Sequence, residues 1–251
     1  MEVIFLGVGE ACDEKYPNTS LLLYTGNQKT LLLDCGFSVT HEFFKYEKDV
    51  NKVDIIWISH FHGDHFLGLP LLLLRFWEQG RIKPLHFVGQ KGIDYVVRSS
   101  MKLAFPTLAD KISFDYIFHQ LVEGEEKEIE EIKFAVASTG HTQPNLGVRI
   151  SDGEKVLYYS GDGPPKEGCY EIAKGCDLLV QETFLLDEDI YGHGNFIDCI
   201  DFARKEGAKS FAAVHMQRDA RSSIVSYFEK NKDKFNDLNV IIPIHGDKIT
   251  L

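Results

Sequence analysis

The chain has 251 residues, of which 44% are hydrophobic and 26% are charged, a balance typical of a folded globular protein. Acidic residues outnumber basic ones by 38 to 27, and the resulting net charge of −11 disfavours general binding to a nucleic-acid backbone. The five cysteines form no Cys-x-x-Cys pair, and the N-terminus has no basic leader before an apolar run. We therefore expect a cytoplasmic protein without disulfides and without a membrane partner.

Apolar runs and turn residues predict a regular alternation of strands and helices. The predicted strands, in chain order, are 2–6, 21–25, 29–33, 53–59, 85–88, 112–118, 129–137, 147–151, 156–160, 178–181, 210–215 and 240–244. Helices are predicted over 69–79, 91–103, 196–206 and 222–231. The acidic run 123–131 is interpreted as a solvated turn. Strands that alternate with helices in both halves, without a linker between them, predict a sandwich-like α/β fold in one domain.

Three histidines and one aspartate follow directly after the predicted strand 53–59. The side chains with metal-binding atoms are His60, His62, Asp64 and His65. Imidazole nitrogen and carboxylate oxygen are common ligands of zinc and iron. One ion cannot use all four side chains and keep an open position, so the spacing favours two metal ions.

Other metal-type side chains lie where further predicted strands end. His141 follows the strand 129–137, Asp162 follows the strand 156–160, and His215 closes the strand 210–215. Folds of the α/β class place their functional sites at such strand ends. His245 also follows a strand, and both it and His215 are candidates for the last ligand, with His215 favoured by its context.

The order of these residues resembles the metallo-β-lactamase superfamily, and further segments resemble its ribonuclease Z branch. Besides the His-x-His-x-Asp-His motif, the likeness rests on Asn18-Thr19-Ser20, Leu33-Asp34-Cys35-Gly36, Gly140-His141, Gly161-Asp162, Gln181-Glu182-Thr183-Phe184 and His193-Gly194-Asn195. The resemblance implies a four-layer αβ/βα sandwich and a single hydrolase domain over residues 1–251.

The resemblance also implies a role for each site residue. One divalent ion would be held by His60, His62 and His141, the other by Asp64, His65 and His215, and Asp162 would bridge both. Two ions about 3.5–4 Å apart clamp a phosphoryl group and deprotonate a bridging water. Zinc is the expected metal, with manganese, iron and nickel as alternatives.

The expected catalytic residues are Asp64, Glu182 and His193. In ribonuclease Z-like proteins the matching glutamate and histidine together protonate the leaving oxygen, and Asp64 lies next to the nucleophile as a proton acceptor. Asp34 is expected to stand behind the metal ligands and orient their loop.

Several departures from typical ribonuclease Z bear on the substrate. Only twenty residues separate His141 from Asp162, an interval that in typical ribonuclease Z carries a long tRNA-gripping arm, so a full grip on tRNA is not expected. Residues unusual for that branch, at Gly163, Thr183 and Asn195, predict altered substrate contacts. Candidates for binding a phosphate are Arg218 and Arg221, and candidates for lining a pocket are Phe61, Phe66, Phe105, Tyr191 and Phe196.

Our first hypothesis is therefore a dinuclear metal-dependent hydrolase, a ribonuclease Z-like phosphodiesterase that uses a metal-bridging hydroxide on a small phosphodiester or an RNA end. The alternative is a superfamily hydrolase of a carboxylic ester, lactone, thioester or β-lactam. A diiron oxygen-binding protein is a third hypothesis, disfavoured because those relatives usually carry an acidic residue at the position of His62. Many relatives are dimers, which makes a homodimer a further hypothesis.

Overall fold

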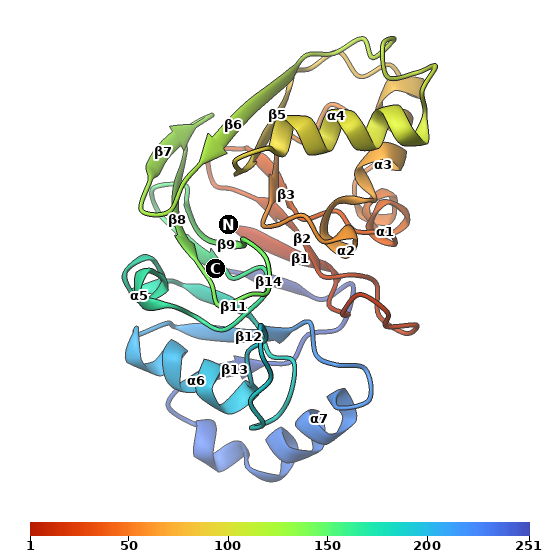
Figure 1. The fold of residues 1–251 in the computed structure, drawn as a ribbon. Coiled ribbons are helices and arrows are strands. Elements are labelled where there is room, and N and C mark those ends of the chain that lie inside the picture. Colours follow the sequence, from red (N-terminus) through yellow and green to blue (C-terminus); the bar gives the residue numbers. More distant parts are fainter.

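The computed structural model describes residues 1–251, and its N-terminal half forms one mixed sheet with its helices (Figure 1). The strands of this sheet are β1 (Glu2–Gly7), β2 (Ser20–Tyr24), β3 (Thr30–Leu33), β4 (Ile55–Ile58), β5 (Leu85–Gln90), β6 (Tyr116–Leu121) and the C-terminal β14 (Lys248–Thr250). The helices of this half are α1 (Val39–Tyr46), α2 (Gly63–Phe66), α3 (Leu69–Glu78) and α4 (Ile93–Ala104). The strand order is β14-β1-β2-β3-β4-β5-β6.

The C-terminal half forms a second sheet of the same size. Its strands are β7 (Glu126–Ile129), β8 (Ile132–Ser138), β9 (Leu146–Ser151), β10 (Val156–Tyr159), β11 (Leu178–Glu182), β12 (Ser210–Val214) and β13 (Asn239–Ile241), in the order β13-β12-β11-β10-β9-β8-β7. The helices are α5 (Glu167–Ala173), α6 (Phe196–Lys205), α7 (Arg221–Lys230) and a 3₁₀ turn (Lys232–Phe235). The strands that carry the candidate site residues are parallel within each sheet: β3 runs parallel to β4, and β10, β11 and β12 run parallel to one another.

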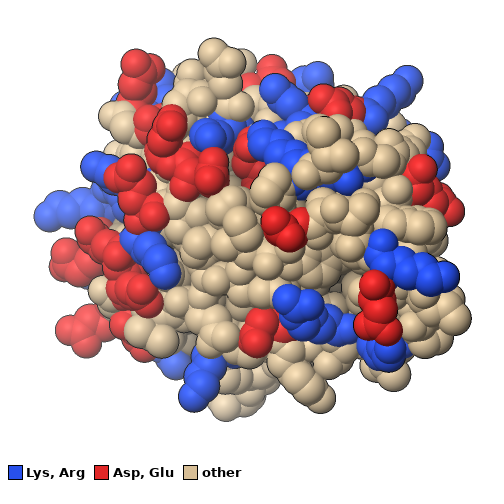
Figure 2. Space-filling view, turned by 90° about the horizontal axis from the view of Figure 1, so that it is seen from above, with Lys and Arg blue, Asp and Glu red and all other residues tan.

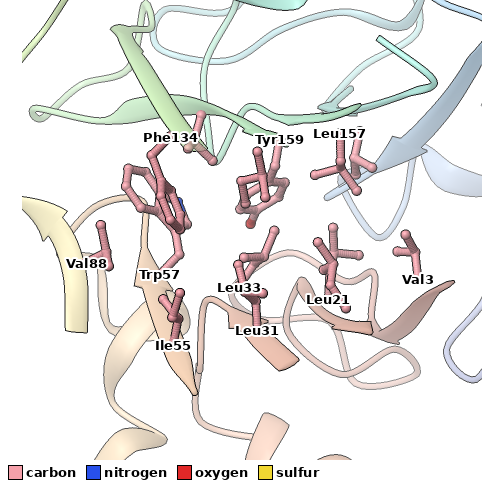
Figure 3. Close-up of a cluster of buried hydrophobic side chains, with 14 of the residues drawn as sticks. Val3, Leu21, Leu31, Leu33, Ile55, Trp57, Val88, Phe134, Leu157 and Tyr159 are labelled. Atoms are coloured by element: carbon pink, nitrogen blue, oxygen red, sulfur yellow. The ribbon is translucent and has the colours of Figure 1, made fainter. Parts of the chain in front are cut away.

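The two sheets pack face to face through an apolar layer (Figure 3). Trp57 of β4 stacks on Phe134 of β8, with ring centroids 6.3 Å apart, and Leu33 lies opposite Tyr159. A second apolar layer joins the first sheet to α1, α3 and α4, and a third joins the second sheet to α5–α7. Since each fully buried large apolar side chain contributes about 1.5–3 kcal/mol, these layers supply most of the driving force for folding. The predicted α/β sandwich is confirmed.

Strands β3 and β4 are apolar along their whole length because both of their faces are covered. Every residue of Thr30–Leu33 and Ile55–Ile58 is buried, as expected for parallel strands between two helix or sheet layers. The hairpin predicted around Gly26-Asn27 is confirmed by the antiparallel pairing of β2 with β3. These strands deliver Asp34 and His60 to the same edge of the sheet.

The prediction for the acidic run 123–131 was wrong, because residues 126–129 form β7. Glu126 and Glu128 of this edge strand are exposed while Ile129 is buried, and such charges discourage pairing with other chains. The turn to β8 places Glu130 and Glu131 at positive φ angles of 50° and 65°. Lys29 forms a 2.8 Å ion pair with Glu130, which ties this turn to the β2–β3 turn of the other sheet.

Two strands differ in extent from their predictions. The strand predicted at 112–118 begins only at Tyr116, since Ile112 and Phe114 pack on the helical side of the first sheet as part of a loop. The strand predicted at 240–244 ends at Ile241, shortly before Pro243, which has no N–H to donate to a ladder. No helix in the structure is long and apolar enough to span a membrane.

Candidate metal centre

The candidate site residues predicted from the sequence converge at the edge where the two sheets meet. The His60–His65 segment leaves the end of β4, and Asp162, Glu182 and His215 follow β10, β11 and β12. His141 lies beyond the end of β8. Residues up to 155 positions apart are thereby brought to one place by the ends of five strands.

Four of these side chains form a first group of possible ligands. The nitrogen or oxygen atoms of His60, His62, His141 and Asp162 all lie within 4.8 Å of one another. His62 Nδ1 is 3.1 Å from His60 Nε2 and 3.0 Å from His141 Nε2. We call His60, His62 and His141 the first half-site.

A second group lies on the other side of Asp162 and consists of Asp64, His65 and His215. Asp64 Oδ2 is 3.2 Å from His65 Nε2 and 3.4 Å from His215 Nε2. We call these three residues the second half-site. His245 is exposed and packs its ring against Tyr16, away from this group, so His215 occupies the position that the sequence left open between the two histidines.

Asp162 presents one carboxylate oxygen to each half-site. Its Oδ2 is 3.7 Å from His60 Nε2 and 3.9 Å from His141 Nε2. Its Oδ1 is 3.3 Å from His65 Nε2 and 3.5 Å from His215 Nε2. This is the geometry required of a carboxylate that bridges two cations.

The donor set fits divalent metal ions. Asp162 Oδ1 and His65 Nε2 are buried without any hydrogen-bond partner, an arrangement that costs about 1–3 kcal/mol per group unless a ligand satisfies it. Burial, followed by the charge of His65, lowers the pKa of His60 well below its usual value. Burial alone raises the pKa of Asp64, but the nearby imidazoles of His215 and His65 outweigh it and lower that pKa. Burial lowers the pKa of His65 and of His215, but the surrounding carboxylates outweigh it and leave both raised. Since neutral imidazole and ionised carboxylate are the forms that bind metals, an ion would displace a proton from each of these two rings.

Asp34 is the predicted carboxylate behind the ligands, and the structure gives it four donors. Ser59 donates to it through its backbone N–H and its hydroxyl, at 2.8 and 2.7 Å. His65 Nδ1 donates at 2.8 Å, which leaves His65 Nε2 to face the second half-site. Tyr159 of the opposite sheet donates at 2.6 Å. Asp34 therefore fixes one ligand and links the two sheets.

Two ligands of the first half-site also have partners behind them. The Ser59 hydroxyl has its one hydrogen on Asp34, so it accepts a hydrogen bond from His60 Nδ1, 3.0 Å away. His141 Nδ1 donates to the carbonyl oxygen of Gly192 at 2.7 Å. Both contacts leave the Nε2 atom of the histidine facing the half-site. Hydrogen bonds to the outer ring nitrogen orient histidine ligands in the same way in metal proteins.

Unusual backbone angles aim several of these side chains. Asp34 and His215 have φ angles of 57° and 56°, a left-handed conformation that costs other residues than glycine about 1–2 kcal/mol. Asp162 lies between Gly161 and Gly163, whose φ angles are 61° and 89°. A Cβ atom on Gly163 would lie 2.6 Å from the backbone nitrogen of His141, so only glycine fits there.

Glu182 and His193 form the predicted pair beside the half-sites. Glu182 Oε1 accepts a short hydrogen bond from His193 Nδ1, and Oε2 accepts from the backbone N–H of Gly163 at 2.5 Å and of Gly194 at 3.1 Å. Burial lowers the pKa of His193, but the hydrogen bond and charge of Glu182 outweigh it and leave that pKa raised. A raised pKa favours the protonated imidazole, which is the form that can act as an acid.

An open cavity of about 360 Å³ is lined by His62 and His141 of the first half-site, by Asp64 and His215 of the second, and by Asp162 and His193. The larger side chains of its wall that were not among the sequence candidates are Glu10, Phe37 and Phe184. Phe37 is 56% exposed, and no local pattern distinguishes it from a core residue. The sequence does give a reason to consider Phe184 as a site residue, because it follows Glu182 by two residues.

Other sequence candidates lie elsewhere. Arg221 is buried, donates to the carbonyl of Pro243 at 2.7 Å and lies over the ring of Tyr16. Arg218 pairs with Glu10 at the rim. Neither guanidinium lines the cavity. The suggested aromatic residues do not line it either: Phe196 is in the core, Phe61, Phe66 and Phe105 pack against the α1–α4 layer, and Tyr191 lines a neighbouring cavity.

The residues unusual for the ribonuclease Z branch have structural roles, and the altered substrate contacts stay a prediction. Gly163 adopts its positive φ and donates to Glu182. The backbone N–H of Thr183 donates to the carbonyl of Val214. Asn195 caps α6 by accepting a hydrogen bond from the Asp198 N–H at 2.8 Å.

Comparison with known proteins agrees with this geometry. The family described as Anti-Pycsar protein Apyc1 matches residues 1–221. The ribonuclease Z of Shouchella clausii (strain KSM-K16) is 25% identical and aligns with 94% of this chain and 91% of its own length.

Two solved structures share the fold. Human tRNase Z, short form (ELAC1), has a TM-score of 0.81 with 22% identity and covers 100% of this chain and 99% of its own. The metallo-β-lactamase fold protein YhfI from Bacillus subtilis has a TM-score of 0.80 with 21% identity, covering 99% and 98%. The predicted metallo-β-lactamase fold and the predicted similarity to ribonuclease Z are thus confirmed.

Proposed function

The chain belongs to the Anti-Pycsar protein Apyc1 family, and we propose that it is a metal-dependent phosphodiester hydrolase with two divalent ions in its two half-sites. The observation that carries the proposal is the position of Asp162, with one oxygen toward each half-site, next to the Glu182–His193 pair. The similarity to ribonuclease Z supports a phosphodiester as the bond that is cleaved.

Each group of residues has its own role in the proposed reaction. Two divalent ions, expected to be zinc, would be held by the two half-sites and by Asp162. They would polarise the phosphoryl oxygens and activate a water molecule. Asp64, which lines the cavity together with Asp162, would accept the proton that this water loses. As the bond from phosphorus to the leaving oxygen breaks, His193 gives that oxygen a proton from Nε2, because Nδ1 is engaged by Glu182.

The proposed substrate is a small, nucleotide-like phosphodiester or a single-stranded RNA end, rather than a folded tRNA. The alignment to the Shouchella clausii ribonuclease Z spans 295 positions, more than this chain has, so that enzyme carries segments that are missing here. The cavity at the site, about 360 Å³, suits a small ligand. Basic and acidic side chains are interspersed on the face seen in Figure 2, without the continuous basic surface that grips a nucleic-acid backbone.

The test is hydrolysis of bis(p-nitrophenyl) phosphate by the zinc- or manganese-loaded protein. We expect Asp162→Ala to lower kcat/KM by more than about 100-fold. A loss of about 100-fold is the largest that is typical when the mutated residue only supports a metal ligand. Asp201→Ala is the matched control, because Asp201 is exposed and pairs only with Arg204. The proposal is wrong if Asp162→Ala keeps wild-type turnover, or if the protein cleaves p-nitrophenyl acetate or a lactone but no phosphodiester.

A further inference from the structure

Phe184 packs directly against His193, the proposed proton donor. Its ring stacks on the imidazole of His193, with centroids 4.2 Å apart and planes inclined by only 20°. The ring of His141 meets His193 edge-on, at 5.3 Å and 74°. The imidazole is therefore held between an apolar ring and a candidate metal ligand.

The hydrogen bond from His193 to Glu182 fixes the imidazole only within its plane. A ring held at one nitrogen can still tilt about that contact, and a tilt would move Nε2 away from the leaving oxygen. An aromatic ring on the face of the imidazole opposes this tilt, and such stacking contributes about 0.5–1.5 kcal/mol beyond the area it buries.

The backbone of Phe184 is itself anchored on both sides. Its N–H donates to the carbonyl of Gly194, next to His193, at 2.8 Å, and its carbonyl accepts from the N–H of Gln217 at 2.9 Å. The short segment from Glu182 to Phe184 thus supplies both the in-plane partner and the stacking partner of His193. Both contacts come from the rigid end of β11.

We propose that Phe184 is a positioning residue that holds His193 in the orientation from which it protonates the leaving group. The inference rests on the proposed phosphodiester hydrolysis and extends it to a residue outside the ligand set and the acid pair. Phe184 also lines the cavity, and its ring centroid lies 6.4 Å from that of His215, but its closest ring contact is His193, through which the proposed effect passes.

The test compares leaving groups that differ in their need for a proton. For a phosphodiester with an alkoxide leaving group, Phe184→Leu should lower kcat by about tenfold and leave KM unchanged. The loss is smaller than the 10²–10⁴-fold that a general acid contributes, because His193 itself is still present. For bis(p-nitrophenyl) phosphate, whose leaving group departs as a stable anion, the change should be less than about twofold. Phe184→Tyr keeps the ring and should restore the rate.

Phe37→Leu is the matched control, because Phe37 lines the same cavity without stacking on His193. It should show no dependence on the leaving group. An equal loss on both substrates in Phe184→Leu, or no loss on either, would overturn the inference.

A second readout separates this inference from the proposed reaction. In the metal-loaded protein, the ¹⁵N–¹H spectrum of the His193 ring should show one fixed orientation, and Phe184→Leu should broaden or split its signals. Unchanged signals in Phe184→Leu overturn the positioning role whatever the substrate is, whereas inactivity of the wild-type protein on phosphodiesters counts against the proposed function alone.

Discussion

The two halves of the candidate metal centre differ in depth. The side chains of Asp64, His65 and His215 in the second half-site are all buried, whereas the first half-site includes the partly exposed His62 beside the buried side chains of His60 and His141. Both half-sites share Asp162, but only the second has a further carboxylate of its own, Asp64. An ion in the second half-site would therefore be more strongly held and less accessible to solvent.

The support behind the ligands is uneven. His65 donates directly to Asp34, which is fully buried and receives three other hydrogen bonds. His60 reaches the same carboxylate only through Ser59, and His141 donates to the carbonyl of Gly192. His62 and His215 have no hydrogen bond from their second ring nitrogen. His65 is therefore the most firmly anchored candidate ligand, which would favour retention of an ion at the second half-site.

The largest expected effect comes from Asp34→Ala, which removes the acceptor of four buried donors. At about 1–3 kcal/mol for each buried polar group left unpaired, and with the loss of a residue that tolerates positive φ, the free energy of unfolding should fall by roughly 3 kcal/mol or more. Urea denaturation of the metal-free protein measures this. Metal binding at the second half-site should weaken as well, because the ring of His65 loses its anchor.

Asp34→Asn is the control for the backbone, since asparagine also tolerates the left-handed conformation at this position. It should cost less than Asp34→Ala. If Asp34→Ala unfolds at the same urea concentration as the wild type, the network behind the second half-site does not contribute to stability, and the contrast between the halves loses its main support.

His62→Ala should abolish metal binding at the first half-site, which we expect to bind its ion more weakly than the second. Since His62 is partly exposed, we expect a change in stability within about 0.5 kcal/mol and a fall from two bound ions to one. Native mass spectrometry gives the number of ions, and His65→Ala provides the comparison, with a loss of stability as well as of metal. Two ions of undiminished affinity in His62→Ala would exclude His62 as a ligand.

The convergence of the candidate ligands was predictable because they follow the ends of apolar strands. The spacing of His60, His62, Asp64 and His65 needs no tertiary knowledge, and the strand ends at Asp162 and His215 follow from local runs of buried residues. Parallel strands present their carboxyl ends at one edge of a sheet, so these side chains converge once the strands are known.

What the sequence could not predict depends on contacts between distant residues. The helix α1 was missed because Val39, Thr40 and two phenylalanines favour a strand, and it is the burial of Val39 and Phe43 against the first sheet that makes this segment helical. The structural roles of Gly163 and Asn195 could not be predicted either, because their partners, Glu182 and the start of α6, are recognisable only in three dimensions.

Ser59→Ala is the smallest and most selective test of the contrast between the half-sites. Removal of the hydroxyl deletes the only link between His60 and Asp34, while the Asp34–His65 hydrogen bond stays intact. Because the loss of such an outer partner typically lowers metal affinity by about 10–100-fold, the first ion should bind more weakly by that factor and the second should be unaffected. Competition with a chromophoric zinc chelator resolves the two affinities. Since Asp34 is shared, an equal weakening of both ions would mean that the carboxylate moves when Ser59 is shortened, and that the two half-sites are coupled through it rather than independently supported.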